Sequence, residues 1–210
     1  YSKAGLVFDH LRAYVGEETM NAIMHSYFDK WKFKHPNPEN LRALAEEASG
    51  EDLSWLFHDL IKTTKQLDYA ITGIKRHHGD SAILNIKNRG TIKAPFSIGS
   101  ILNDSLIRVD WYPGTMKQQI RMECDTCDRY IIDPKGNTAE SNRKNNQIRN
   151  RGLFRKLKPI RLQFLGGFVR PERAQVNWTP TIGWNNNDGF MAGGAVYNNL
   201  IPNNRFDYFI

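Results

Sequence analysis

Residues 53–74 read LSWLFHDLIKTTKQLDYAITGI, and the spacing of the apolar side chains changes within this stretch. Up to Ile61 the apolar residues recur at positions i, i+3 and i+4, which is the spacing of an amphipathic helix. After Gln66 they alternate with polar residues, which is typical of a strand with one buried face. The sequence therefore predicts a helical segment over residues 1–66 and β structure from residue 67 onward.

Four short helices are expected before this change. Gly16 is a natural C-terminal cap for the first, and Asn37 is a candidate N-cap for the third. Gly50 would close the third helix, and Glu51 or Asp52 would cap the fourth. Because the links between them are short, we expect antiparallel neighbours in a small helical layer.

Two β regions follow the helices. Residues 67–134 contain about six or seven short apolar runs separated by turn-forming residues, with no helical pattern between them, which predicts an antiparallel β-sandwich. Residues 159–210 show a second period-2 pattern, with 185–189 as a hairpin loop, and predict a β-meander. Its last run, 206–210, would be an unpaired edge strand, so we expect a truncated parent protein. The fold class is therefore multidomain α+β.

The composition excludes several classes of protein. A chain of 210 residues with 40% hydrophobic and 24% charged residues is neither fibrous nor wholly disordered. No run approaches the roughly 18 to 20 apolar residues of a membrane-spanning helix, which excludes that kind of span. The net charge of +7 is local, because residues 135–210 hold twelve basic and four acidic side chains. Residues 135–158 are therefore predicted to be a basic, Asn-rich linker.

The basic stretch also admits two binding interpretations. Between Lys135 and Arg161, nine basic residues accompany one acid, Glu140, and such a run can hold nucleic-acid phosphates or an acidic membrane surface. It has no interleaved aromatic residue before Phe154. We favour the linker and predict no nucleic-acid partner; steep salt-dependent DNA binding would indicate the opposite.

Cys124 and Cys127 form the sequence Cys-Asp-Thr-Cys, for which three interpretations stay open. It could be a redox pair, half of a four-cysteine zinc site, or a local disulfide. A second Cys-x-x-Cys is missing, and the surroundings indicate strand and turn instead of a helix start. A structural turn, oxidised or not, is favoured.

No zinc-ligand pattern is present in the 210 residues. A hydrolytic zinc site needs three protein ligands at suitable spacing, as in His-Glu-x-x-His, and this motif does not occur. His77 and His78 are neighbours in an expected turn, where they cannot easily reach one ion. The other histidines are expected on helix surfaces or in side-chain packing: His10, His25, His35 and His58. We therefore predict no metal ligand and no cofactor in this segment.

The opening residues resemble a known family. The pieces that carry the resemblance, in chain order, are Tyr1-Ser2-Lys3, Gly16-Glu17-Glu18, Tyr27, Trp31, Phe33, His35, Pro36, Pro38, and Ser49 to Ser54 with Trp55 and Phe57. Their succession resembles the end of the catalytic domain in zinc aminopeptidases of the aminopeptidase N type, the gluzincins, over roughly residues 1–67. The resemblance implies that the following strands form the β-sandwich found in many relatives, with Ile132-Asp133-Pro134 as its closing strand.

The resemblance assigns the catalytic role to Tyr1. In that family a tyrosine donates a hydrogen bond to the oxyanion of the tetrahedral intermediate, while zinc and an upstream glutamate activate water for peptide hydrolysis. Lys3 is followed here by Ala4-Gly5, whereas the family usually has Gly directly after Lys. Because His-Glu-x-x-His is missing, the implied zinc and substrate sites belong to an upstream catalytic half of the parent chain, and this segment alone is predicted to be inactive. The alternative is a non-catalytic accessory or binding module of a cell-surface protein.

The last segment carries a second resemblance. Thr179-Pro180, Gly183-Trp184-Asn185 and Asp188-Gly189-Phe190 look like the opening strands of surface-antigen or outer-membrane β-barrel domains of Gram-negative bacteria. Such strands alternate apolar with small or polar residues and carry aromatic residues near their ends. This resemblance implies a periplasmic, outer-membrane or cell-surface location. A soluble sandwich has the same period, so that interpretation stays open beside it.

Overall fold

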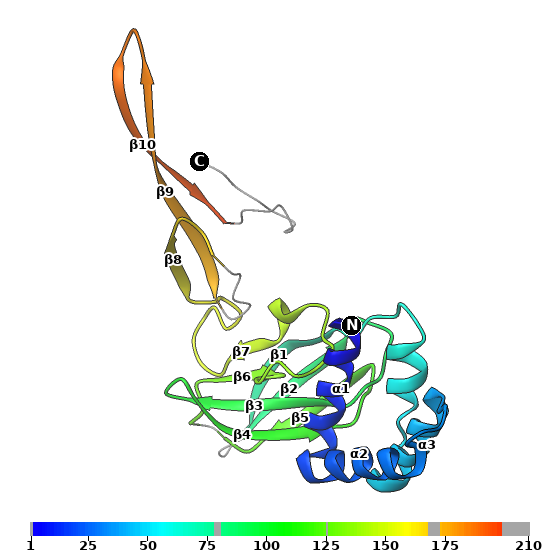
Figure 1. Ribbon diagram of the computed structural model, residues 1–210. Helices are drawn as coiled ribbons and strands as arrows, with labels where there is room; N and C mark the ends of the chain where they lie inside the picture. Colours follow the sequence, from blue (N-terminus) through cyan, green and yellow to red (C-terminus); the bar gives the residue numbers. More distant parts are fainter. Residues whose placement is uncertain (1, 78–80, 125, 168–172, 199–210) are drawn as a thin grey trace. The chain divides into compact units, whose positions relative to one another are not determined.

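The computed structural model describes residues 2–77, 81–124, 126–167 and 173–198 (Figure 1). The chain forms two compact units, Tyr1–Arg155 and Lys156–Ile210. Within the described residues, no helix combines the length and the apolar character needed to cross a membrane. The first unit contains helices and two sheets, and the second contains one sheet, which confirms the α+β class.

The helical layer begins and ends close to the predicted residues. Its elements are α1 (Ser2–Val15), α2 (Glu17–Trp31), α3 (Pro38–Ser49) and η1 (Trp55–Ile61). Gly16, at φ 89°, separates α1 from α2, and Gly50, at φ 70°, ends α3. Both angles lie in the left-handed region that glycine adopts without a Cβ clash. The Asn37 side chain accepts from the Asn40 amide at 3.1 Å, and the Asn40 side chain bonds back to the Asn37 amide, so the predicted cap of α3 is confirmed.

The fourth helical segment differs from its prediction in two respects. η1 is a π-helix, and its N-cap is Ser54 instead of Glu51 or Asp52. Asp52 accepts a hydrogen bond from the Ser54 amide at 2.9 Å, so it closes the turn before the helix. Four large side chains of η1 are buried, and they hold it against the rest of the unit: Trp55, Leu56, Phe57 and Leu60.

Seven strands form two sheets in the described part of the first unit. One sheet has the order β1-β2-β5, with β1 (Tyr69–His77), β2 (Ser81–Asn88) and β5 (Lys117–Met122). The other has the order β4-β3-β6-β7, with β4 (Ser105–Tyr112), β3 (Phe96–Leu102), β6 (Arg129–Ile132) and β7 (Gln147–Arg149). All pairings in both sheets are antiparallel. The buried Tyr69 and Phe96 rings stack at 4.2 Å between centroids, and α1 contributes Val7 and Leu11 to the same core.

The structure differs from the linker expected at 135–158. Residues up to Arg155 belong to the first unit, and they supply strand β7, the short 3-10 helix η2 (Arg143–Asn145) and the buried Ile148. Two polar residues of this stretch bond to backbone carbonyls of the first unit: Asn150, which is fully buried, donates to the Cys127 carbonyl at 3.0 Å, and Arg143 donates to the Gly136 carbonyl at 2.9 Å. The composition of residues 135–158 indicated a solvated segment, because composition does not show which polar side chains form hydrogen bonds with buried backbone groups.

The second unit is a three-stranded mixed sheet. β9 (Ala174–Asn185) pairs antiparallel with β10 (Gly189–Tyr197), and the predicted hairpin loop between them is confirmed. β8 (Ile160–Phe164) pairs parallel with β9, so the predicted meander is wrong at this pair. The alternation of apolar and polar residues indicates which side chains share a face of the sheet, but it does not indicate in which direction the neighbouring strand runs. The strand expected at 206–210 lies outside the described residues.

Candidate functional site

The expected catalytic residue, Tyr1, lies outside the described residues. The next charged side chain along the chain, Lys3, donates from Nζ to the carbonyl of Thr63 at 2.8 Å. This bond ties the first turn of α1 to the end of η1. A Cβ built on Gly5 would meet nothing within 4 Å, so within this chain Gly5 has open space beside it.

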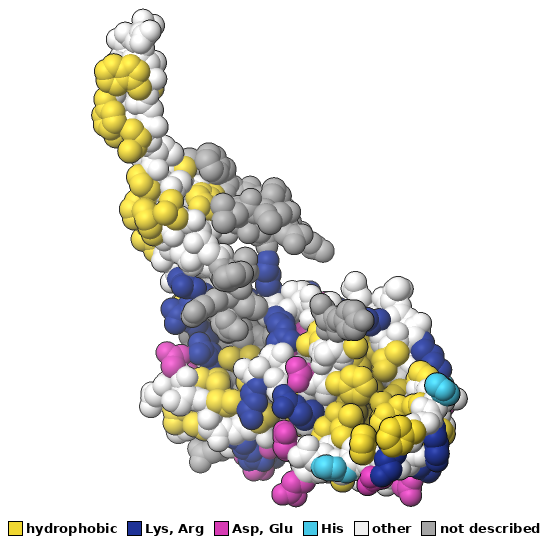
Figure 2. Space-filling model, viewed as in Figure 1, with side chains coloured by type: hydrophobic (Ala, Val, Ile, Leu, Met, Phe, Trp, Pro, Cys, Tyr) yellow, Lys and Arg dark blue, Asp and Glu magenta, His cyan; other side chains and the backbone are white. Residues whose placement is uncertain are grey.

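An apolar groove begins beside Lys3 and runs over the helical layer. It has a volume of about 540 Å³, and side chains from α1, α2, α3 and η1 line it together with the turn before α3. The lining side chains are Lys3, Ala4, Val7, Phe8, Tyr27, Pro36, Asn37, Pro38, Leu41, Phe57 and Ile61. Figure 2 shows hydrophobic side chains gathered over these helices. The lining is mainly apolar, so the groove offers little hydrogen bonding to an occupant.

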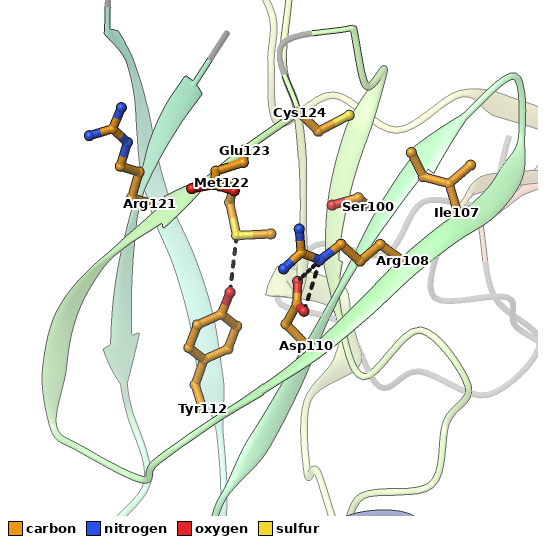
Figure 3. A pocket seen from close by; sticks show the side chains of 9 residues that line it. All are labelled: Ser100, Ile107, Arg108, Asp110, Tyr112, Arg121, Met122, Glu123 and Cys124. Atoms are coloured by element: carbon orange, nitrogen blue, oxygen red, sulfur yellow. Dashed lines mark hydrogen bonds and ion pairs between the residues drawn. The ribbon is translucent and has the colours of Figure 1, made fainter.

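A second, polar pocket of about 240 Å³ lies between strands β4 and β5, at the edges of the two sheets (Figure 3). Arg108 and Asp110 form an ion pair in it, with Nε at 2.8 Å from Oδ2, and this bond raises the pKa of Arg108. Tyr112 donates to the Met122 sulfur at 3.6 Å, and burial raises the pKa of Tyr112. In Figure 3 the Arg121 side chain points away from the ion pair. Among its described lining residues, the pocket thus holds no nucleophile next to a base.

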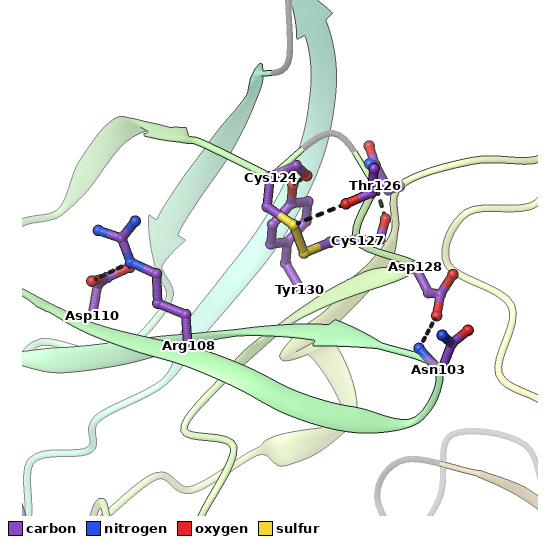
Figure 4. Close-up of a disulfide and its surroundings, with 9 residues drawn as sticks. Asn103, Arg108, Asp110, Cys124, Thr126, Cys127, Asp128 and Tyr130 are labelled. Carbon is purple, nitrogen blue, oxygen red and sulfur yellow. Dashed lines mark hydrogen bonds and ion pairs between the residues drawn. A yellow bond between two sulfur atoms is a disulfide. The ribbon is translucent and has the colours of Figure 1, made fainter.

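The two cysteines are joined in a disulfide on the rim of this pocket (Figure 4). Cys127 is buried, and the Tyr130 hydroxyl donates to the carbonyl of Cys124. The carboxylate of Asp128, next to the bridge, accepts from the Asn103 amide at 2.6 Å. The favoured structural turn is therefore present in its oxidised form, and in this form neither sulfur is a free thiolate ligand.

Of the histidines that the structure describes, His10 and His58 lie in different elements, whereas the expectation for the pair His77 and His78 falls on side chains outside the described part. His10 is fully buried, with Nε2 at 2.9 Å from the Pro95 carbonyl and its ring 4.7 Å from that of Trp55. Burial lowers the pKa of His10 to about 4, so it is neutral at pH 7. His58 lies on the surface beside Arg42. In the part of the chain that the structure describes, no three His, Cys, Asp or Glu side chains gather as metal ligands. These residues by themselves do not fit a zinc centre.

Sequence reasoning missed a buried polar cluster that contains Glu140. This side chain is 8% exposed, and its Oε1 accepts from the Tyr69 amide at 2.6 Å. Burial, with lesser contributions from Asp68 and Asp133, raises the pKa of Glu140 to about 9, while Arg143 acts in the opposite direction. The carboxyl is therefore protonated at pH 7. The one available signal was that Glu140 is the lone acid within the basic stretch.

Replacing Glu140 by glutamine is expected to stabilise the protein above pH 5. In the unfolded chain Glu140 titrates near 4.5, and in the folded chain near 9, so the folded state binds more protons between these values and the free energy of unfolding falls as the pH rises. A glutamine side chain has no such ionisation cost, so the difference in the free energy of unfolding should shift in favour of glutamine by about 3 kcal/mol between pH 4.5 and pH 7. Urea denaturation of both proteins from pH 4.5 to 8 measures the difference.

The dependence of the free energy of unfolding on pH below about 6.5 serves as an internal control. His10 titrates near 6.5 when unfolded and near 4 when folded, so the free energy of unfolding falls as the pH drops through this window in both proteins. A difference between the two proteins that did not grow from pH 4.5 to pH 8 would contradict the assignment of the raised pKa to Glu140.

Comparisons with known proteins point to one enzyme class. No family model matches the chain. The chain is 33% identical over 79 residues to Aminopeptidase M1-A of Oryza sativa subsp. japonica, and 34% identical over 76 residues to Aminopeptidase M1-C of the same plant. These matches cover 38% and 36% of this chain but only 9% and 8% of the relatives. The chain is therefore similar to a short part of these aminopeptidases.

A solved structure shares the fold. The crystal structure of Legionella pneumophila aminopeptidase A in complex with aspartic acid aligns with a TM-score of 0.56 and 13% sequence identity. The alignment covers 67% of this chain and 17% of that one. At this identity the likeness concerns the fold alone. The chain is thus similar in sequence, over somewhat more than a third of its length, to part of two plant aminopeptidases, and similar in fold to part of a bacterial one.

Proposed function

We propose that this chain is a segment of a zinc-dependent aminopeptidase of the gluzincin type, in which residues 1–66 end the catalytic domain and the two sheets follow it. The observation that carries the proposal is the identity of one third over 79 residues to a curated aminopeptidase. The likeness of 67% of this chain to part of another aminopeptidase supports it at the level of the fold. The substrates of the whole protein would be peptides with a free N-terminus.

Tyr1 is the residue of this chain that we propose for the reaction. A phenol stays protonated near pH 7 and is a neutral hydrogen-bond donor. Aimed at the oxygen that becomes negative in the tetrahedral intermediate, it stabilises charge that develops only in the transition state. Its role is thus to bind the oxyanion.

The rest of the reaction centre would come from residues outside these 210. The described side chains do not fit a zinc centre, and the sequence has no His-Glu-x-x-His. We propose that the apolar groove over α1, α2, α3 and η1 receives this remaining catalytic part of the same polypeptide. Lys3 and Ala4, which line the groove, are two and three residues after Tyr1 in the sequence, so a partner seated there would lie next to the start of α1.

A two-part reconstitution tests this proposal. The 210-residue chain and the remaining part of its natural polypeptide would be produced separately, mixed, and assayed with an aminoacyl p-nitroanilide. We expect peptidase activity only in the mixture, and loss of it on adding a chelator. Activity of the 210-residue chain alone would contradict the proposal, and a complete natural polypeptide without peptidase activity would favour the accessory module.

Within that assay, Leu41→Lys should weaken reconstitution by at least about tenfold in the concentration of chain required. Leu41 lines the groove, and a cationic side chain there must be desolvated when the partner binds. Ala43→Lys is the matched control, because Ala43 lies on the exposed side of the same helix. Equal effects of the two substitutions would exclude the groove as the interface, and thermal unfolding of each variant checks that the helical layer is intact.

A further inference from the structure

The sheet of the second unit has one face that is apolar throughout its described residues. Residues that pair across neighbouring strands point to the same side of a sheet, so the register defines two faces. Trp178 pairs with Val196 on one side and Phe164 on the other, and the Phe164 and Trp178 rings lie 5.0 Å apart. The complete face, here called the apolar face, consists of Ile160, Leu162, Phe164, Ala174, Val176, Trp178, Pro180, Ile182, Trp184, Phe190, Ala192, Gly194 and Val196.

The apolar face is the exposed one. Ile182, Trp184 and Phe190 are 75%, 71% and 64% exposed, and on β8 Ile160 and Leu162 are 73% and 67% exposed. Figure 2 shows hydrophobic side chains in a continuous band along these strands. Such a contiguous exposed apolar surface is rare on a protein surrounded by water and marks a contact with another apolar phase or partner.

The opposite face is mostly polar or small, apart from Met191 and Tyr197, and it includes the buried residues. Asn177 and Tyr197 are 3% and 6% exposed, and Gln175 donates to Gln163 at 3.0 Å on this side. Thr181 lies beside Gly193, where an added Cβ would come within 2.9 Å of the Thr181 hydroxyl oxygen. The buried residues of the sheet thus lie on the side opposite the apolar face, whereas an ordinary soluble sheet buries its apolar side.

We propose that the apolar face of β8, β9 and β10 contacts the acyl chains of a lipid membrane. In the described strands the apolar face carries no charged residue, whereas an interface between two proteins normally includes polar groups at its rim. The strands have suitable lengths, with 12 residues in β9 and 9 in β10, against about 9 to 11 for a strand that crosses a bilayer.

The aromatic residues support the same partner. Trp184 and Phe190 pair at the hairpin end, and Trp178 with Phe164 lies six positions along β9. At about 3.3 Å per residue the two aromatic groups are about 20 Å apart along the strand. At the usual tilt of about 40° this is about 15 Å along the membrane normal, so the stretch between them fits inside the roughly 25 Å apolar band of membrane strands. Small or aliphatic residues lie between them: Pro180, Ile182, Ala192 and Gly194.

The backbone limits how this contact is made. In the described part of the sheet, β8 and β10 are edges, and unpaired backbone groups are not tolerated in hydrocarbon. A complete crossing would require further strands on both edges, so the proposal concerns the contact of the apolar face with acyl chains. This contact does not depend on the peptidase assignment, and either can fail without the other.

Vesicle flotation of the 210-residue chain tests the proposal. Vesicles of phosphatidylcholine alone, in high salt, exclude attraction of the basic residues to anionic lipid. We expect the chain to float with the vesicles, and brominated acyl chains to quench a tryptophan component that Trp184→Phe removes. A chain that stays at the bottom of the gradient, or shows no such quenching, would overturn the proposal.

Two matched lysine substitutions locate the contact. Ile182→Lys places a charge in the middle of the apolar face, and Thr181→Lys places the same charge on the neighbouring residue of the opposite face. Ile182→Lys should lower the partition coefficient between vesicles and water at least about tenfold. A lysine against hydrocarbon costs more than the roughly 1.4 kcal/mol that corresponds to a tenfold change in this coefficient. Thr181→Lys should change the coefficient less than about twofold. Equal losses would contradict the proposal. So would a dimer in buffer that Ile182→Lys dissociates, because it would assign the face to a second copy.

Discussion

Tyr1→Phe in the complete natural polypeptide should lower kcat by about 10² to 10³, with KM almost unchanged. Removing one donor to a developing oxyanion has an effect of this size, because the hydrogen bond strengthens only in the transition state. An unchanged KM follows for the same reason: the ground-state carbonyl is barely stabilised by this donor. The measurement is steady-state kinetics on an aminoacyl p-nitroanilide, with zinc content determined in parallel. Zinc content should not change, since Tyr1 is proposed as a donor and not as a ligand.

Tyr14→Phe is the control for this experiment. It removes a phenol hydroxyl from α1, where Tyr14 donates to Glu51 at 2.9 Å and is not among the residues that line the groove. Its kcat should match that of the unaltered protein. A Tyr1→Phe protein whose kcat falls less than about threefold would remove Tyr1 from the reaction, even if the polypeptide is an aminopeptidase.

Asp133→Ala should destabilise the first unit by about 3 to 5 kcal/mol, the cost of breaking a buried ion pair from one side. The Asp133 side chain is 2% exposed and lies 2.9 Å from the Arg143 guanidinium. It also accepts from the amides of Asn137 and Thr138 at 2.8 and 3.1 Å and from the Thr138 hydroxyl at 2.7 Å. Alanine leaves all of these donors without their acceptor. Urea denaturation followed by tryptophan fluorescence measures the loss.

Two further variants separate the causes. Asp133 has a φ of 52°, which asparagine tolerates better than alanine, so Asp133→Asn isolates the loss of charge from backbone strain and should cost less than Asp133→Ala. Asp29→Ala removes an exposed partner of Lys32 at 3.5 Å and should change stability by less than about 1 kcal/mol. A similarly small loss for Asp133→Ala would show that Arg143 and the turn find other partners.

Of the candidate site, the sequence supplied the role of Tyr1 through a resemblance, and the comparisons support that resemblance at the level of an aminopeptidase-like segment. The sequence did not predict the apolar groove. Phe8, Tyr27, Leu41 and Phe57 come from four helical elements, and each fits its own helix pattern as an ordinary core residue. Only their packing leaves a concave apolar surface between them.

Local patterns by themselves determined the helix ends at Gly16 and Gly50, the cap at Asn37 and the approximate positions of the described strands other than β7. Caps and side-chain periods depend on neighbours along the chain. Tertiary structure alone decided that β8 runs parallel to β9, that Glu140 is buried and neutral, and that residues 135–155 belong to the first unit. The physical reason is common to all three. A sequence records which side chains avoid water, but strand partners, desolvation and the pairing of buried polar groups depend on residues brought together from distant parts of the chain.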